Sequence, residues 1–73
     1  MYKEDERLFK YPREYWEELI RQWIRDEKAR YCLTRNFLDG VPYEQIASEL
    51  NIVTGTVYNK MSKYAPILFD HVK

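Results

Sequence analysis

The fold is decided by residues 43–61, which read Tyr43-Glu-Gln-Ile-Ala-Ser-Glu-Leu-Asn-Ile-Val-Thr-Gly-Thr-Val-Tyr-Asn-Lys-Met61. Apolar residues recur at spacings of three and four on both sides of a short break, as on the inner faces of two helices. The residues expected to face inward are Ile46, Ala47, Leu50, Ile52, Val57 and Met61. Asn51 suits the break because Asn tolerates the left-handed backbone conformation. The stretch predicts two short helices that cross at a tight turn, which is a helix-turn-helix.

The outer face of the second helix carries groups that can bond to phosphates and base edges. This candidate DNA-binding set comprises Thr54, Gly55, Thr56, Tyr58, Asn59, Lys60 and Lys63. No acidic residue occurs between Leu50 and Phe69. We expect the helix of about residues 54–64 to lie in the major groove of duplex DNA, with the helix of about residues 42–50 crossing above it. For Thr54 and Thr56, local helix capping is an equal alternative to phosphate contact.

Three segments carry a resemblance to a known family: Arg35-Asn-Phe-Leu-Asp-Gly40, Tyr43-Glu-Gln-Ile-Ala47 and Leu50-Asn-Ile-Val-Thr-Gly-Thr-Val-Tyr58. From about Asp26 to about Tyr64, the chain resembles the helix-turn-helix of sigma factor region 4 and the small phage and mobile-element regulators similar to it. In two places the chain departs from that pattern. Asn51 replaces the turn glycine, and Val53 replaces the usual Ser or Thr helix cap. This leaves the second helix without a side-chain acceptor unless the cap moves to Thr54 or a DNA phosphate occupies the site.

The resemblance implies a sequence-specific double-stranded DNA-binding protein that acts as a transcription regulator or a sigma-like accessory factor of a phage, plasmid or bacterium. Its implied partners are duplex DNA, a second copy of the chain, and RNA polymerase or another regulatory protein. An alternative of a different class is a protein–protein interaction module that keeps the helix-turn-helix scaffold and binds polymerase, a repressor or a host defence factor.

Charge is the main observation against simple DNA binding, because 12 basic and 12 acidic residues give a formal net charge of zero. Non-specific DNA affinity comes largely from phosphate neutralisation, so a neutral protein needs its positive charge on one face. The arginines that distinguish the two alternatives are Arg21, Arg25, Arg30 and Arg35. Placed beside Lys60 and Lys63 they would make a DNA face, and placed elsewhere they would not.

The 73 residues predict one domain with a small core, for which oligomerisation often supplies part of the stability. We expect an N-terminal arm at residues 1–11 and a single helical domain at residues 12–73, with the helix-turn-helix at about residues 42–64. The chain shows no signal-peptide or membrane-span pattern, which favours the cytoplasm. Cys32 is the only cysteine, so it can form neither an intramolecular disulfide nor a thiolate cluster for zinc.

Before the turn, Pro12 predicts a helix start. The helix after it carries an apolar stripe of Trp16, Leu19, Ile20, Trp23 and Ile24, which suits either the core or a homodimer seam. Asp26 can cap a second helix, although the two helices could also be continuous. Gly40 and Pro42 mark the next turn. Ala65–Pro66 is expected to interrupt the recognition helix, with one or two closing turns after it.

The fold class that follows is all-α, a small bundle of four to five helices. Catalytic chemistry has little support. The lone histidine, His71, lies beside Asp70 near the C-terminus, and its spacing from Cys32 and from the serines does not predict a catalytic group. The two glycines are isolated, so no phosphate-cradling loop is predicted. We therefore expect a protein that is not an enzyme and that needs no metal or cofactor.

Overall fold

The computed structural model describes residues 10–72, and the regular secondary structure in this range is entirely helical, without a strand. Its elements are α2 (Arg13–Trp23), α3 (Glu27–Leu33), the π-helical turn η2 (Thr34–Leu38), α4 (Tyr43–Leu50) and α5 (Thr54–Asp70). The expected all-α architecture is confirmed. The arm expected at residues 1–11 lies almost wholly outside the described residues. Within them, no helix has the length and apolar character that crossing a membrane requires.

Helix α2 begins directly after Pro12, as the sequence predicts. Most of its apolar stripe is core: Trp16, Leu19, Ile20 and Ile24 are all buried. Trp23 departs from the stripe, since 43% of its surface is exposed and its ring stacks on His71 with the ring centroids 3.7 Å apart. The reason is that α2 ends at Trp23, and Ile24, in extended backbone, takes the buried position beyond it.

Helix α3 is separate from α2, so the expectation that Asp26 begins a second helix is confirmed, and the alternative of one continuous helix is wrong. The carboxylate of Asp26 accepts a hydrogen bond from the backbone N–H of Ala29 at 3.1 Å, which is the expected N-cap. The buried face of α3 consists of Ala29, Cys32 and Leu33. The helix then widens into η2, whose five residues carry the chain towards the turn at Gly40.

Two residues with positive φ set the turns on either side of α4. Gly40 has a φ of 71°, and Asn51 has a φ of 57°, the left-handed conformation expected of it. The N–H groups of Asn51 and Ile52 donate to the carbonyls of Ser48 and Ala47, at 3.2 and 2.9 Å. This pair of bonds is the Schellman arrangement, which ends a helix and fixes the direction of the chain that follows.

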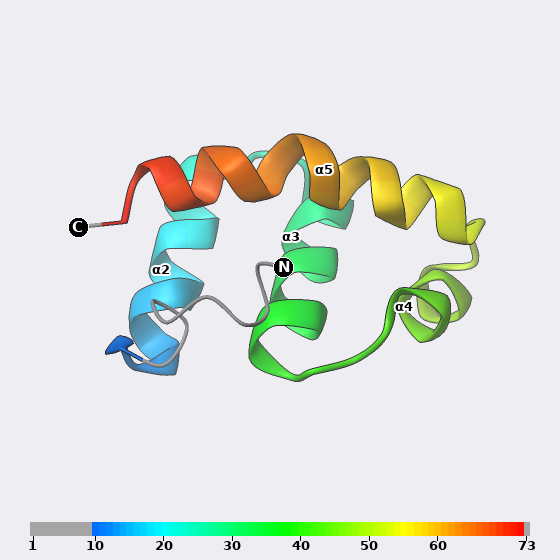
Figure 1. Cartoon of the computed structure of the whole chain (residues 1–73), viewed down its shortest axis with the longest axis horizontal. Helices are drawn as coiled ribbons and strands as arrows, with labels where there is room; N and C mark the ends of the chain where they lie inside the picture. Colours follow the sequence, from blue (N-terminus) through cyan, green and yellow to red (C-terminus); the bar gives the residue numbers. More distant parts are fainter. Residues whose placement is uncertain (1–9, 73) are drawn as a thin grey trace.

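Helix α5 runs from Thr54 to Asp70 without a break, so the predicted interruption at Ala65–Pro66 is wrong. At 17 residues it is ~25 Å long, and Figure 1 shows it lying across α4, α3 and α2 in turn from its N-terminus. Its buried residues are Val57, Met61, Ala65, Leu68 and Phe69. A proline inside a helix costs about 3 kcal/mol. Burial of Leu68 and Phe69, worth about 1.5–3 kcal/mol each, offsets that cost.

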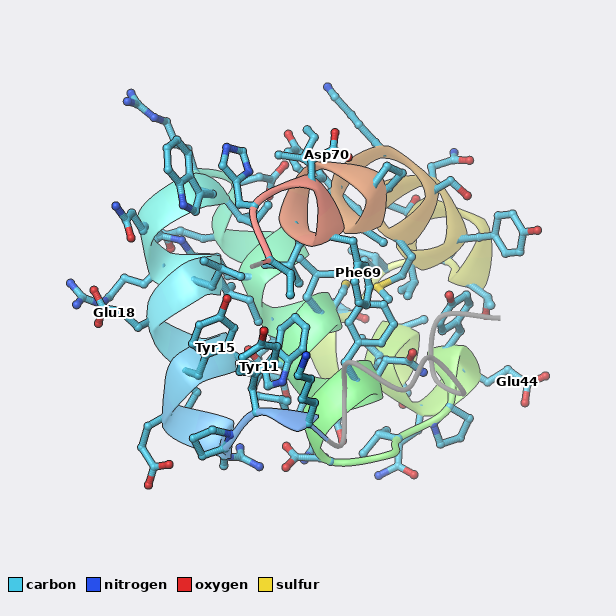
Figure 2. The ribbon with its side chains drawn as sticks, turned by 60° about the vertical axis from the view of Figure 1, so that its left-hand side comes forward. Tyr11, Tyr15, Glu18, Glu44, Phe69 and Asp70 are labelled. Atoms are coloured by element: carbon cyan, nitrogen blue, oxygen red, sulfur yellow. The ribbon has the colours of Figure 1, made fainter. Side chains whose placement is uncertain are left out.

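Aromatic rings join α2 to the C-terminal half of α5. The rings of Tyr11 and Tyr15 are stacked with their centroids 4.3 Å apart, and they lie together on one side of the molecule (Figure 2). Trp16 packs edge-on against both tyrosines, and its ring centroid lies 5.5 Å from that of Phe69. This cluster anchors the far end of α5 and leaves its first turns at the opposite end of the molecule (Figure 1).

Candidate nucleic-acid interface

The seven residues of the candidate set all lie on the first three turns of α5. Thr54, Gly55, Tyr58, Asn59 and Lys63 are exposed, whereas Thr56 and Lys60 are half-buried. The helix is held from the other side by Val57 and Met61, which are 0% and 3% exposed. The structure therefore gathers most of the candidate set on one accessible surface of a helix that is itself well anchored.

The N-terminus of α5 has no side-chain cap. Val53 occupies the N-cap position, with φ −79° and ψ 152°, and neither Thr54 nor Thr56 takes over the capping role. Val53 is 71% exposed, and a Cβ placed on Gly55 would meet nothing within 4 Å. The start of α5, at the positive end of the helix dipole, therefore has no side-chain cap and lies beside exposed residues.

Tyr58 is the most exposed aromatic residue among residues 10–72, at 59%. Its ring meets the ring of Tyr43 edge-on, with centroids 5.9 Å apart. Tyr43 is half-buried at the start of α4, and desolvation raises the pKa of its phenol. The ring of Tyr43 thus packs against the ring of Tyr58 on the side that faces α4. Sequence reasoning missed this role, because the two tyrosines are 15 positions apart and only the crossing of α4 and α5 brings them together.

The two lysines of the candidate set differ in their surroundings. The ammonium of Lys60 forms an ion pair with the carboxylate of Asp26. The hydrogen bond in this pair lowers the pKa of Asp26 and raises the pKa of Lys60. Lys63 is exposed, and its ammonium lies over the ring of Tyr64, 5.3 Å from the centroid. Lys63 is therefore the lysine of α5 whose charge is directed to the surroundings of the molecule.

Three of the four arginines that could extend a DNA face are engaged within the fold. Arg30 donates to the backbone carbonyls of Arg21 and Ile24, where it satisfies the C-terminal end of α2. Arg21 pairs with Glu18 on α2. The guanidinium of Arg35 bonds to Glu49 of α4 at 2.7 Å. These three arginines do not join Lys63 on the outer face of α5.

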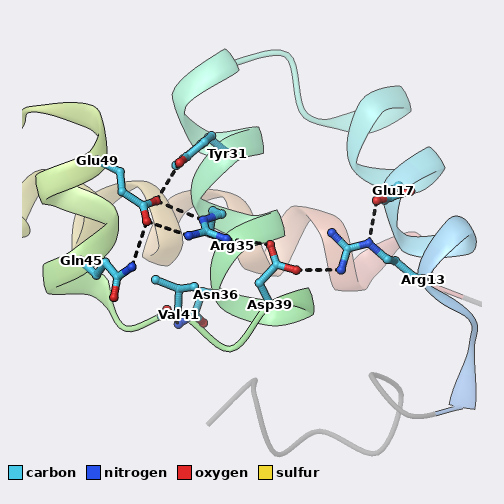
Figure 3. Close-up of polar contacts among 9 residues, drawn as sticks. All are labelled: Arg13, Glu17, Tyr31, Arg35, Asn36, Asp39, Val41, Gln45 and Glu49. Carbon is cyan, nitrogen blue, oxygen red and sulfur yellow. Dashed lines mark hydrogen bonds and ion pairs between the residues drawn. The ribbon is translucent and has the colours of Figure 1, made fainter.

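Arg35 is the centre of a polar network that ties α4 to α3 and η2 (Figure 3). Besides Glu49, it contacts Asp39 at 3.2 Å, and Asp39 in turn accepts from Arg13 at 2.8 Å. The phenol of Tyr31 donates to Glu49 at 2.7 Å. Bonds from Arg35 and Tyr31 lower the pKa of Glu49 to about 2. The network links α4 to α3 and η2. It also pairs the guanidinium groups of Arg13 and Arg35 with carboxylates, so these groups are not available to phosphates.

Other kinds of site are not prominent in residues 10–72. This range contains no group of three or more His, Cys, Asp and Glu residues placed to hold a metal ion. Cys32 is fully buried, and desolvation raises the pKa of its thiol. The accessible start of α5, with its polar face, is the most developed candidate surface. Comparison of the chain with protein-family models, with curated proteins and with solved structures found no match.

Proposed function

We propose that this chain is a helix-turn-helix protein that binds double-stranded DNA. The N-terminal half of α5 enters the major groove, and α4 crosses above it, as docking of this motif requires. The observation that carries the proposal is the exposed, uncapped start of α5, held on a turn whose direction is fixed by Asn51. A recognition helix needs both features, because its first turns contact bases while its orientation stays rigid.

The exposed side chains divide into two roles. Asn59 and Tyr58 present groups that can bond to base edges, and Asn is well suited to a bidentate contact with adenine. Lys63, Thr54 and the uncapped N-terminus of α5 suit phosphate oxygens, which favour the positive end of a helix. The first group supplies sequence preference, and the second group supplies affinity and register.

The zero net charge limits the affinity of one copy of the chain. With Lys60 paired and three arginines engaged elsewhere, Lys63 is the lysine of α5 that remains for phosphate contact in a monomer. A dimer doubles the number of contacts, so we propose that the protein binds two half-sites as a homodimer and acts as a transcription regulator. The half-sites would then be spaced by about one helical turn of DNA.

A second candidate function is protein binding by the same scaffold, with polymerase or another regulatory protein as partner. The ion pairs of Arg21 with Glu18 and of Arg35 with Glu49 favour it, because each pair neutralises a positive charge that could otherwise contact phosphates. The exposed Val53 and Tyr58 beside the turn would serve as apolar contacts. The two candidates share one surface and differ in the chemistry of the partner.

Selection from a randomised duplex pool at low salt, followed by sequencing, separates the two candidates. Duplex binding predicts an enriched motif, and a dimer predicts a palindrome. On the selected duplex, K63A should weaken binding to all sequences and lower the salt dependence, whereas N59A should change the preference between sequences. Retention without enrichment, or no retention, would move the assignment to the protein-binding candidate.

A further inference from the structure

We infer that Asp26 restrains DNA binding by holding the ammonium of Lys60 away from the duplex. This inference rests on the proposed function and concerns the regulation of the same surface. Lys60 belongs to α5 and Asp26 precedes α3, so the pair joins elements that are 34 residues apart in the chain. Removing this contact should release a positive charge next to the surface proposed to meet the phosphates.

Asp26 is well placed to hold a lysine because its carboxylate is itself fixed. One oxygen, Oδ1, accepts the capping bond from the N–H of Ala29 at 3.1 Å. The other, Oδ2, accepts from Nζ of Lys60. The cap prevents the carboxylate from following Lys60 outward, so the lysine has to leave its partner in order to reach DNA.

Lys60 borders the proposed interface by its position on the helix. It lies one turn after Thr56 and one turn before Lys63, and it directly follows Asn59. Its four-carbon stem lets the ammonium move by several ångströms without any movement of α5. Released from Asp26, the charge can therefore reach the same phosphates that Lys63 approaches.

The pair lies at the surface of the molecule, so Lys60 has a direct path to solvent once the carboxylate is removed. The side chains of Lys60 and Asp26 are 26% and 24% exposed, so water and salt reach both partners. Ion pairs of this kind are weak compared with the same charges in a dry interior. The contact thus lowers affinity for DNA without abolishing it, as expected of a restraint built into the fold.

The decisive variant is D26N, measured on the selected duplex across a salt series. Asn caps helices as well as Asp does, so α3 keeps its N-cap while Lys60 loses its carboxylate. One additional phosphate contact steepens the dependence of log K on log salt by about 0.9. The ratio of the DNA-binding constant of D26N to that of the original chain should therefore fall by about 3.5-fold between 50 and 200 mM salt.

Two matched controls separate release of Lys60 from a simple change in net charge. E27Q removes the same unit of negative charge one residue away and leaves the pair intact, so its salt slope should equal that of the original chain. K60M in the original chain should leave the slope unchanged, because the paired lysine contacts no phosphate. K60M added to D26N should return the slope to its original value.

The outcomes distinguish failure of this inference from failure of the proposed function. If the original chain retains no duplex at low salt, DNA binding itself is wrong. If it binds but D26N and E27Q have equal slopes, Asp26 does not restrain Lys60. A slope lowered by about 0.9 in K60M alone would also overturn the inference, because Lys60 would then contact DNA without any release. This last variant needs no change at Asp26, so the test holds even if D26N fails to fold.

Discussion

At the scale of single residues, Asn36 shows how one buried amide holds the path between α3 and α4. Its side chain is 8% exposed, and Nδ2 donates to the carbonyl of Val41 at 2.9 Å. The N36A variant leaves that carbonyl without its donor, so we expect the free energy of unfolding to fall by about 1–3 kcal/mol. Urea unfolding followed by circular dichroism measures this loss. N36D, which sets an acceptor against the carbonyl, should lose more, and a loss below about 0.5 kcal/mol in N36A would show that the bond contributes little.

Residues whose roles depend on their immediate neighbours could be predicted from the sequence. The cap at Asp26, the left-handed backbone of Asn51 and the turn at Gly40 follow from local rules, and the structure confirms all three. The roles of Asn36 and Lys60 could not be predicted in this way. Lys60 was assigned to phosphates because no acid lies near it in the sequence, yet its partner is 34 residues away and is brought close only by packing of α5 on α3.

At the scale of elements, α5 continues through a proline, and this has a measurable cost. Pro66 cannot donate to the carbonyl of Ser62, and a proline is about 3 kcal/mol less favourable than alanine inside a helix. P66A restores the donor at an exposed position, so the free energy of unfolding should rise by about 1–3 kcal/mol in urea. The control S62A changes an exposed side chain of the same helix and should shift stability by less than about 0.5 kcal/mol. A less stable P66A would mean that restriction of the unfolded chain by proline outweighs the missing bond.

Pro66 also shows which features of the helices could be predicted from the sequence and which could not. Helices α2, α3 and α4 begin where Pro12, Asp26 and Pro42 predict, because capping is a local property. The break predicted at Pro66 followed an equally sound local rule, which burial of Leu68 and Phe69 overrides. The same distinction applies to the candidate interface. Its exposed face could be predicted from helical periodicity, whereas the support of Tyr58 by Tyr43 required the crossing of two helices.

At the scale of the whole molecule, ion pairs that span elements couple stability to pH. The pKa values of Asp26, Asp39 and Glu49 are all lowered by hydrogen bonds to basic side chains, and the pKa of Glu49 falls from 4.5 to about 2. A carboxylate whose pKa is lower in the folded state contributes stability above its ordinary pKa. That contribution is lost as the pH falls through the lower value. We therefore expect the melting temperature to decline from about pH 5 towards pH 2.

The share of this decline due to Glu49 can be isolated with E49Q, because glutamine takes up no proton. Melting followed by circular dichroism should show a lower melting temperature for E49Q than for the original chain at pH 7, where Arg35 loses one of its two charged partners. The difference in melting temperature should narrow between pH 4.5 and about 2. The control E44Q removes an equal charge from the exposed side of α4, outside the Arg35 network (Figure 2). All three chains approach a charge of about +13 in acid, from 12 Lys and Arg plus one His, so general repulsion affects them almost equally. A gap that stays constant with pH would mean that E49Q acts through lost packing of α4 and not through the charge of Glu49.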